Sequence, residues 1–214
     1  MTDGRRIIAL VFSLVLCGNT FGDVIYPDRT QFINATQGGS LSHFGFNANF
    51  AWAPVVDFGA FTVSAASGDV FTSSAASEGA QAAGFAGPSA TITFDTPINA
   101  FAIDLVDWGT NPSDFLPAGS RELRVANDTG SFNHIVATAD AASGIDLEVR
   151  FFGVVSNTPF SSVTVSKTTS PGDSIGLDNM LFGSVTAIPE PSAGLMFGWL
   201  LIGQTIWLRR RRSV

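Results

Sequence analysis

The sequence has very few of the residues that cross-link a fold or ligate a transition metal. Its single cysteine, Cys17, stands near the N-terminus, so no intramolecular disulfide can form. Its two histidines, His43 and His134, are isolated, with no His or Cys partner at metal-ligand spacing. Both are interpreted as structural or surface residues. The fold must therefore be held by packing, or by ions that bind oxygen ligands.

Positive charge is also scarce between the two ends of the chain. Residues 23–188 contain 16 Asp plus Glu but only five Lys plus Arg, a formal net charge of −11. Such a charge argues against a nucleic-acid partner, and against an anionic polysaccharide held by simple attraction. A cation or a neutral sugar fits it better.

Long apolar runs are missing except near the two termini. At the N-terminus, Arg5 and Arg6 precede the apolar stretch Ile7 to Leu16, which is the pattern of a secretory signal peptide. We expect residues 1–22 to be this signal helix, cut by signal peptidase at its end or, alternatively, after Gly18.

At the other end, the apolar run Ala193 to Leu208 is interrupted only by Gln204 and Thr205. As a helix, its 16 residues span about 24 Å, slightly less than the roughly 30 Å of the hydrocarbon core of a bilayer. The four arginines that follow can extend its reach and should stay cytoplasmic. The pattern predicts a C-terminal transmembrane helix, with the preceding chain exported.

A Pro-Glu-Pro motif precedes this apolar run. The order of motif, short helix and arginine cluster over Ile188 to Arg212 resembles the PEP-CTERM sorting signal of Gram-negative bacteria. The resemblance implies that a membrane-embedded exosortase cuts off the tail, residues 188–214, so that the anchor in the inner membrane is temporary. It also implies a place on the cell surface or in the extracellular matrix, with exopolysaccharide and biofilm matrix as partners. The sorting-signal residues are Pro189, Glu190, Pro191, Arg209, Arg210, Arg211 and Arg212.

Residues 23–187 have the pattern of one all-β domain. Short segments of alternating polarity are separated by Gly, Pro, Asn and Asp, which predicts an antiparallel β-sandwich. In residues 90–94, apolar side chains alternate with threonines, and Asp95-Thr96-Pro97 predicts a turn after them. The segment Ser64 to Ser89, rich in Ala, Ser and Gly, is expected to be a long loop. The expected strands are Gln31 to Ala35, Gly45 to Ala51, Gly59 to Ala65, Ser89 to Asp95, Ala100 to Val106, Arg121 to Ala126, Ile135 to Thr138, Ile145 to Val154, Ser162 to Lys167 and Leu177 to Gly183.

Two parts of this domain resemble a known module. Residues 92–98 with 101–104, and residues from Phe152 to Asn179, are similar to strands of a lectin-like β-sandwich common in PEP-CTERM proteins. The resemblance implies a jelly-roll or galactose-binding-like sandwich. It names no ligand.

Residues 172–176 read Gly-Asp-Ser-Ile-Gly and match the nucleophile elbow of hydrolases by their letters. That motif works only where a strand turns sharply into a helix, whereas a strand is predicted here. The histidines also precede Ser174, which is the wrong chain order, although triads are defined by geometry and His134 is a conceivable partner. We therefore expect no enzyme, with a Ser174 hydrolase as the lesser alternative.

Asp178 stands out because strand alternation places it on the same face as Met180 and Phe182. A buried carboxylate without a partner costs on the order of several kcal/mol. One interpretation is a structural Ca²⁺ bound by Asp178 and loop carbonyls, with Asp173 or an N-terminal acid such as Asp28 as a further ligand. The other is that Asp178 accepts hydrogen bonds from backbone N–H groups or pairs with Arg150 or Arg124.

Trp108 lies close in sequence to Asp104 and Asp107, at a predicted loop. An indole beside carboxylates is typical of sugar sites, where the ring stacks on the sugar and the acids accept hydrogen bonds from its hydroxyls. Trp52 can serve in the same way. The alternative is that these residues are core aromatics and solvated loop acids.

Together, these patterns favour an exported, non-catalytic β-sandwich that binds a glycan at the cell surface or in the matrix, in association with exopolysaccharide. A purely structural, self-assembling matrix component is the alternative from a different class. Apart from the Ca²⁺ considered above, no cofactor is expected.

Overall fold

The computed structural model of the chain describes residues 23–106, 121–139, 149–168 and 174–186. Contacts between Cα atoms divide the chain into two units, and all of these residues belong to the unit Gly22–Ala187, which is described by itself below. The predicted signal peptide and the predicted sorting tail lie outside the described residues. Within the described ranges, no helix is long and apolar enough to cross a membrane.

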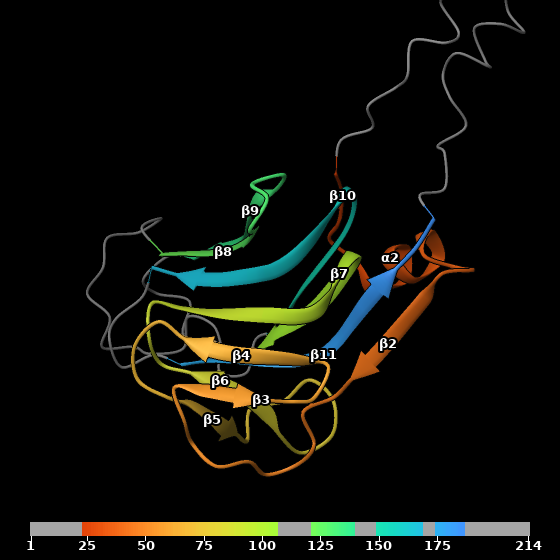
Figure 1. Ribbon diagram of the computed structural model, residues 1–214. Helices are drawn as coiled ribbons and strands as arrows, with labels where there is room; N and C mark the ends of the chain where they lie inside the picture. The colour runs from red at the N-terminus through yellow and green to blue at the C-terminus, as the bar shows by residue number, and fades with distance from the viewer. Residues whose placement is uncertain (1–22, 107–120, 140–148, 169–173, 187–214) are drawn as a thin grey trace, which may run out of the picture. The chain divides into compact units, whose positions relative to one another are not determined.

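The described residues form eleven β-strands and one short α-helix (Figure 1). Every pairing between the strands is antiparallel, which confirms the predicted all-β antiparallel class. Assignment to a jelly-roll or galactose-binding-like topology stays a prediction. The elements are β1 (Val24–Tyr26), α2 (Arg29–Ala35), β2 (Ser40–Phe44), β3 (Val55–Asp57), β4 (Phe61–Ala65), β5 (Val70–Ser73), β6 (Ala82–Phe85), β7 (Ser89–Val106), β8 (Arg121–Asn127), β9 (Asn133–Ala139), β10 (Val149–Lys167) and β11 (Ile175–Ser184).

Two long strands, β7 and β10, run side by side through the whole sheet. The first part of β7 pairs with β4, and its last part pairs with β11. Both strands bend where their register shifts, between Val155 and Ser162 of β10. The sheet therefore curls, and Figure 1 shows its two halves facing each other. One half contains β3, β4, β8 and β9, and the other contains β1, β2, β5, β6 and β11.

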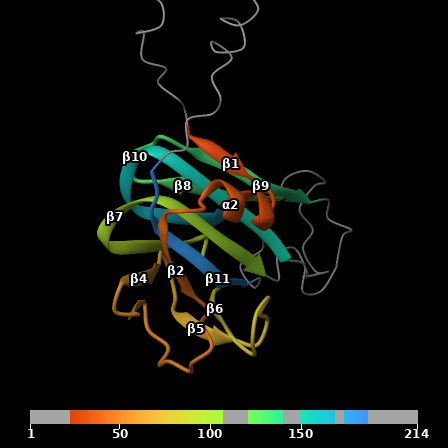
Figure 2. The same cartoon turned by 90° about the vertical axis from the view of Figure 1, so that its right-hand side faces the viewer.

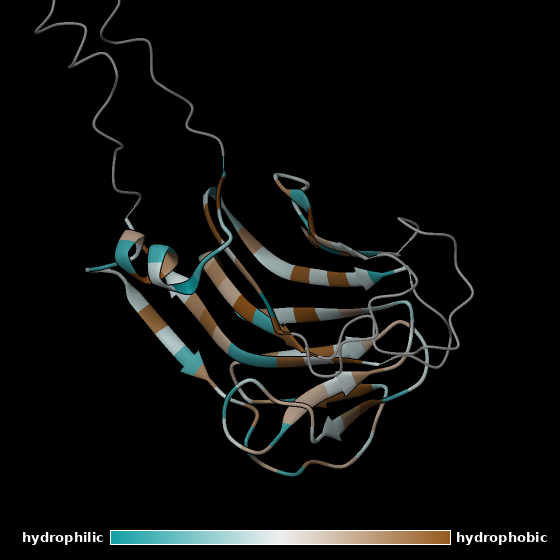
Figure 3. Ribbon diagram, turned by 180° about the vertical axis from the view of Figure 1, so that it is seen from behind, coloured by the Kyte–Doolittle hydropathy of each residue, from teal (hydrophilic) through white to brown (hydrophobic). Residues whose placement is uncertain are grey.

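Aromatic side chains from the two halves meet inside the curl. Phe61 of β4 lies 5.5 Å from Phe182 of β11, centroid to centroid, and Phe132 lies 5.8 Å from Phe152 of β10. All four belong to one buried cluster. Burying each such ring contributes roughly 1.5–3 kcal/mol. Apolar bands alternate with paler ones along the long strands in Figure 3, because every second side chain faces this core.

Helix α2 covers part of the outer face of the half that contains β11 (Figure 2). Its Phe32 is fully buried against Ala100 and Ala102 of β7. The helix begins after Asp28, whose side chain accepts a hydrogen bond from the backbone N–H of Gln31. The predicted strand at 31–35 is therefore wrong, because a capped helical turn places Phe32 on the sheet.

Three other expectations about strands are also wrong. Residues 45–51 form no strand, and the preceding segment β2 pairs with β11 instead. The expected loop at 64–89 contains β5 and β6. Residues 95–97 form no turn between two strands but lie in the bend of β7, where they are exposed and do not pair with β10. Pro97, which has no N–H, is tolerated at such a position.

Candidate functional site

A β-bulge in β11 determines which of its side chains face the core. Asp178 lies opposite Asp104 and Leu181 lies opposite Ala102, so three steps along β11 match two along β7. The extra residue is Asn179, with a positive φ of 47°. Because of this bulge, the prediction that Asp178 shares a face with Met180 and Phe182 is wrong: they pack in the core with Leu177, and Asp178 does not.

Asp104 and Asp178, called the acid pair below, lie side by side on neighbouring strands and are 6% and 0% exposed. Two adjacent buried carboxylates are costly unless charge and hydrogen bonds compensate them. Arg29 of α2 lies 2.9 Å from Asp104 Oδ1. Asp178 Oδ2 accepts hydrogen bonds from the backbone N–H groups of Ser77 at 2.8 Å and Glu78 at 2.7 Å. The alternative in which backbone donors hold Asp178 is thus confirmed.

The hydroxyl of Ser77 links the two acids, at 2.8 Å from Asp104 Oδ2 and 3.0 Å from Asp178 Oδ2. The side chain of Asn179 donates to Asp104 Oδ2 at 3.0 Å, and its backbone carbonyl accepts from Arg29 at 2.8 Å. At the surface, His43 Nε2 lies 3.0 Å from Glu78 Oε2 and 2.8 Å from Asn179 Oδ1. His43 is a surface residue, as predicted.

The other carboxylate oxygen of Asp178, Oδ1, is buried and has no hydrogen-bond partner among the described residues. Those residues contain no group of three or more acids, histidines or cysteines placed to hold a metal ion. Asp173, the predicted second ligand, lies outside them. Calcium at Asp178 therefore stays a prediction from the sequence.

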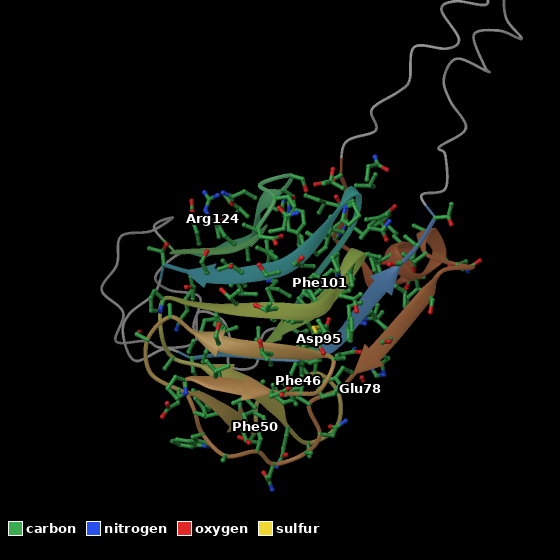
Figure 4. The ribbon with its side chains drawn as sticks, in the orientation of Figure 1. Phe46, Phe50, Glu78, Asp95, Phe101 and Arg124 are labelled. Carbon is green, nitrogen blue, oxygen red and sulfur yellow. The ribbon has the colours of Figure 1, made fainter. Side chains whose placement is uncertain are left out.

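A second feature is a cleft of about 510 Å³ beside Trp52, called the Trp52 cleft below. It is built by β5 and by the chain segments that precede β3 and β6. The ring of Trp52 is 68% exposed and lies 5.5 Å from the ring of Phe71, centroid to centroid. Figure 4 labels Phe50 in this lower part of the molecule. The lining residues are Asn49, Phe50, Trp52, Thr72, Ser73, Ser74, Ala80 and Gln81.

Hydrogen bonds hold the polar wall of the Trp52 cleft. Gln81 Nε2 donates to Asn49 Oδ1 at 2.7 Å, and Thr72 Oγ1 lies 3.4 Å from the backbone nitrogen of Phe50 and 3.5 Å from its carbonyl oxygen. The eight lining residues are all uncharged. Such a site offers a flat aromatic surface beside neutral donors and acceptors, and it provides no countercharge for an ionic ligand.

The residues predicted to bind a glycan fall in three places. Trp108 and Asp107 lie outside the described residues. Asp104 belongs to the buried acid pair, where its carboxylate already bonds to Arg29. Trp52 lines the cleft with neutral partners rather than acids. The sequence does not reveal these partners, because Gln81 lies in a segment rich in Ala, Ser and Gly that predicts a long loop.

Ser174 directly precedes β11, so a strand and not a helix follows it. A nucleophile elbow needs a helix at this point. His134 lies on β9, which β8, β10 and β7 separate from β11 in the order of the sheet. Its ring packs 5.9 Å from the ring of Phe152. The local fold around Ser174 thus lacks the arrangement that the motif requires.

No protein family model matches the sequence, and no curated protein matches it. Among solved structures, a family 29 carbohydrate-binding module complexed with mannohexaose is 10% identical, with 68% of this chain and 94% of that chain covered and a TM-score of 0.31. A family 28 module specific for non-crystalline cellulose is 10% identical, with 54% of this chain and 82% of that chain covered and a TM-score of 0.32. Similarity at this level does not identify what this chain binds.

Proposed function

We propose that this chain is an exported, non-catalytic β-sheet protein that binds a neutral glycan in the Trp52 cleft. The observation that carries the proposal is an indole ring, two-thirds exposed, fixed at the edge of a cleft lined by uncharged hydrogen-bonding side chains. An exposed aromatic ring beside polar side chains in a cleft offers a flat face on which a sugar ring can stack. Trp52 therefore acts as the stacking surface.

The chemistry of the cleft matches a sugar ring. The C–H groups of one sugar face can lie on the electron-rich face of Trp52, and the sugar hydroxyls can exchange hydrogen bonds with Asn49, Thr72 and Ser73. A volume of about 510 Å³ is in the range of small-ligand sites. The net charge of −11 over residues 23–188 favours a neutral over an anionic polysaccharide.

The binding test uses cellohexaose and mannohexaose as neutral probes and hexagalacturonate as an anionic one, measured by calorimetry. We expect at least one neutral probe to bind more tightly than the anionic probe. Trp52→Ala should raise the Kd about tenfold, which corresponds to about 1.4 kcal/mol, as expected for a lost aromatic contact.

Val55→Ala is the matched control, because Val55 is also exposed, at 57%, but does not line the cleft. Its affinity should equal that of the unmodified protein. Equal binding by the Trp52→Ala protein would contradict the proposal. Silence toward all neutral probes, together with concentration-dependent assembly, would favour the structural matrix component instead.

Export rests on the sequence alone. The signal peptide at 1–22 and the PEP-CTERM-like tail at 188–214 support secretion across the inner membrane, a temporary anchor, and cleavage by an exosortase near Pro189-Glu190-Pro191. The product would be released to the cell surface or to a matrix of exopolysaccharide. Intact mass measurement of the protein from an exosortase-containing host should show a chain without Arg209 to Arg212. A mature chain that retains them would mean a permanent anchor.

A further inference from the structure

The chain between β5 and β6, residues 74–81, connects the acid pair to the Trp52 cleft and is called the β5–β6 loop below. Its two ends line the cleft, through Ser74, Ala80 and Gln81. Its middle residues, Ser77 and Glu78, make the contacts with Asp178. One short segment therefore contacts both sites.

The contact with Asp178 is the buried anchor of this loop. A single carboxylate oxygen, Oδ2, accepts three hydrogen bonds from the loop, two from successive backbone N–H groups and one from the hydroxyl of Ser77. Asp178 itself is fully buried on β11. Hydrogen bonds to a carboxylate are stronger than those between neutral groups, and the burial of Asp178 protects its hydrogen bonds from competition by water.

The remaining contacts of the loop lie nearer the surface. Glu78 meets His43 at 3.0 Å, and both side chains are nearly half exposed. Gly79 has a positive φ of 69° and packs so closely on Asn47 that a Cβ would collide with that side chain. Gln81 then donates to Asn49 across the cleft. Gln81, which bonds to the opposite wall of the cleft, therefore lies only three positions after Glu78, which bonds to Asp178.

We propose that Asp178 is a positioning residue for the Trp52 cleft, which it shapes by holding the β5–β6 loop from below. Asp104 supports it because its Oδ2, 2.8 Å from Ser77 Oγ, shares the single hydroxyl proton of Ser77 with Asp178. The inference rests on the proposed function as far as glycan affinity is concerned. The position of the loop itself can be measured without a ligand.

The unpartnered Oδ1 of Asp178 provides a conservative variant. In Asp178→Asn the amide oxygen can still accept from the loop, and the NH₂ group takes the place of the oxygen that makes no hydrogen bond. In Asp178→Ala the two backbone N–H groups lose their acceptor altogether. A positioning role therefore predicts that Asp178→Asn retains most of the loop protection and glycan affinity that Asp178→Ala loses.

The experiment compares Asp178→Ala, Asp178→Asn and Asp128→Ala with the unmodified protein. Asp128 is the matched control because its carboxylate also accepts from a backbone N–H, that of Ser161 at 3.2 Å, but away from the cleft. Amide hydrogen exchange reports on residues 76–81, and calorimetry with cellohexaose and mannohexaose reports affinity. Circular dichroism checks that each variant is folded.

For Asp178→Ala we expect amide exchange at residues 76–81 at least tenfold faster and a Kd raised five- to twentyfold, with Asp178→Asn within threefold of the unmodified protein in both. Asp128→Ala should change neither. Unchanged exchange in the folded Asp178→Ala protein would overturn the inference, and so would unchanged affinity in a protein whose binding depends on Trp52.

Failure of the proposed function has a different signature. If Trp52→Ala binds both probes like the unmodified protein, glycan binding in the cleft is wrong, and hydrogen exchange alone then decides the role of Asp178. If Asp178→Ala does not fold, Ser77→Ala replaces it, because that change removes only the hydroxyl contacts. Exchange over residues 78–81 should then rise about threefold, and no rise would overturn the inference.

Discussion

The acid pair and the Trp52 cleft are joined by one loop, whose middle contacts Asp178 and whose two ends line the cleft, but they differ in burial and in charge. The acid pair is buried and charged, and its hydrogen bonds join α2, β7, β11 and the β5–β6 loop. The cleft is open and neutral, and its most prominent side chain is largely exposed. The difference teaches that the buried charges of the acid pair hold elements of the fold together, whereas the proposed binding surface consists of an aromatic ring and neutral polar groups.

Removing Arg29 should have the largest effect, because it would break the charge balance of the acid pair. Arg29→Met keeps an apolar stem against Phe151, over whose ring the guanidinium lies at 4.9 Å, but removes the positive charge beside Asp104. We expect a loss of about 2–3 kcal/mol in the free energy of unfolding, measured by urea denaturation, since a buried carboxylate loses its partner.

Arg124→Met is the control for this change. Arg124 pairs with Glu122 at 2.7 Å, but both side chains are about one-third exposed, so its removal should cost less than about 1 kcal/mol. Equal losses in the two variants would mean that the acid pair depends little on Arg29.

The opposite behaviour is expected at the cleft. Trp52→Ala should change the free energy of unfolding by less than about 0.5 kcal/mol, because most of the ring is already in water. The same urea denaturation measures it, beside the calorimetric loss of glycan affinity. A loss of stability as large as that of Arg29→Met would show that Trp52 belongs to the core and would remove the contrast between the two sites.

Chelation should have the smallest effect. Asp178 Oδ2 already accepts hydrogen bonds from the loop, and the positive Arg29 beside Asp104 disfavours a second cation there. We therefore expect EDTA to shift the Tm by less than about 2 °C. A larger drop that added Ca²⁺ reverses would support the calcium site predicted at Asp178 and Asp173.

Residues 90–94 show what the sequence allowed us to predict. Ala90, Ile92 and Phe94 are buried and alternate with the less buried Thr91 and Thr93, as the period of two requires. The same rule failed at Asp178, because a single inserted residue, Asn179, reverses the alternation. No local pattern marks such a bulge, which depends on the partner strand.

The candidate sites depend on contacts between residues far apart in the chain. Trp52 was recognisable as an aromatic residue able to bind a sugar, but its partners Thr72 and Gln81 come from a segment without apolar periodicity. The sequence predicts Asp104 to line a sugar site and Asp178 to bind either an ion or backbone N–H groups, so it does not link the two residues. Only strand pairing brings them together, and that register is not readable from either segment alone.

The sharing of β7 and β10 between both halves of the sheet has a consequence for folding. Each half of the sheet includes part of β7 and part of β10, so we expect the two halves to unfold together. Residues 89–93 pair with 162–166, and residues 100–106 with 149–155, so these stabilising contacts join distant parts of the chain. High contact order slows folding, to about milliseconds or seconds in comparable β-proteins. If the chain is exported unfolded, as the proposed signal peptide implies, this sheet can be completed only after both long strands have crossed the membrane.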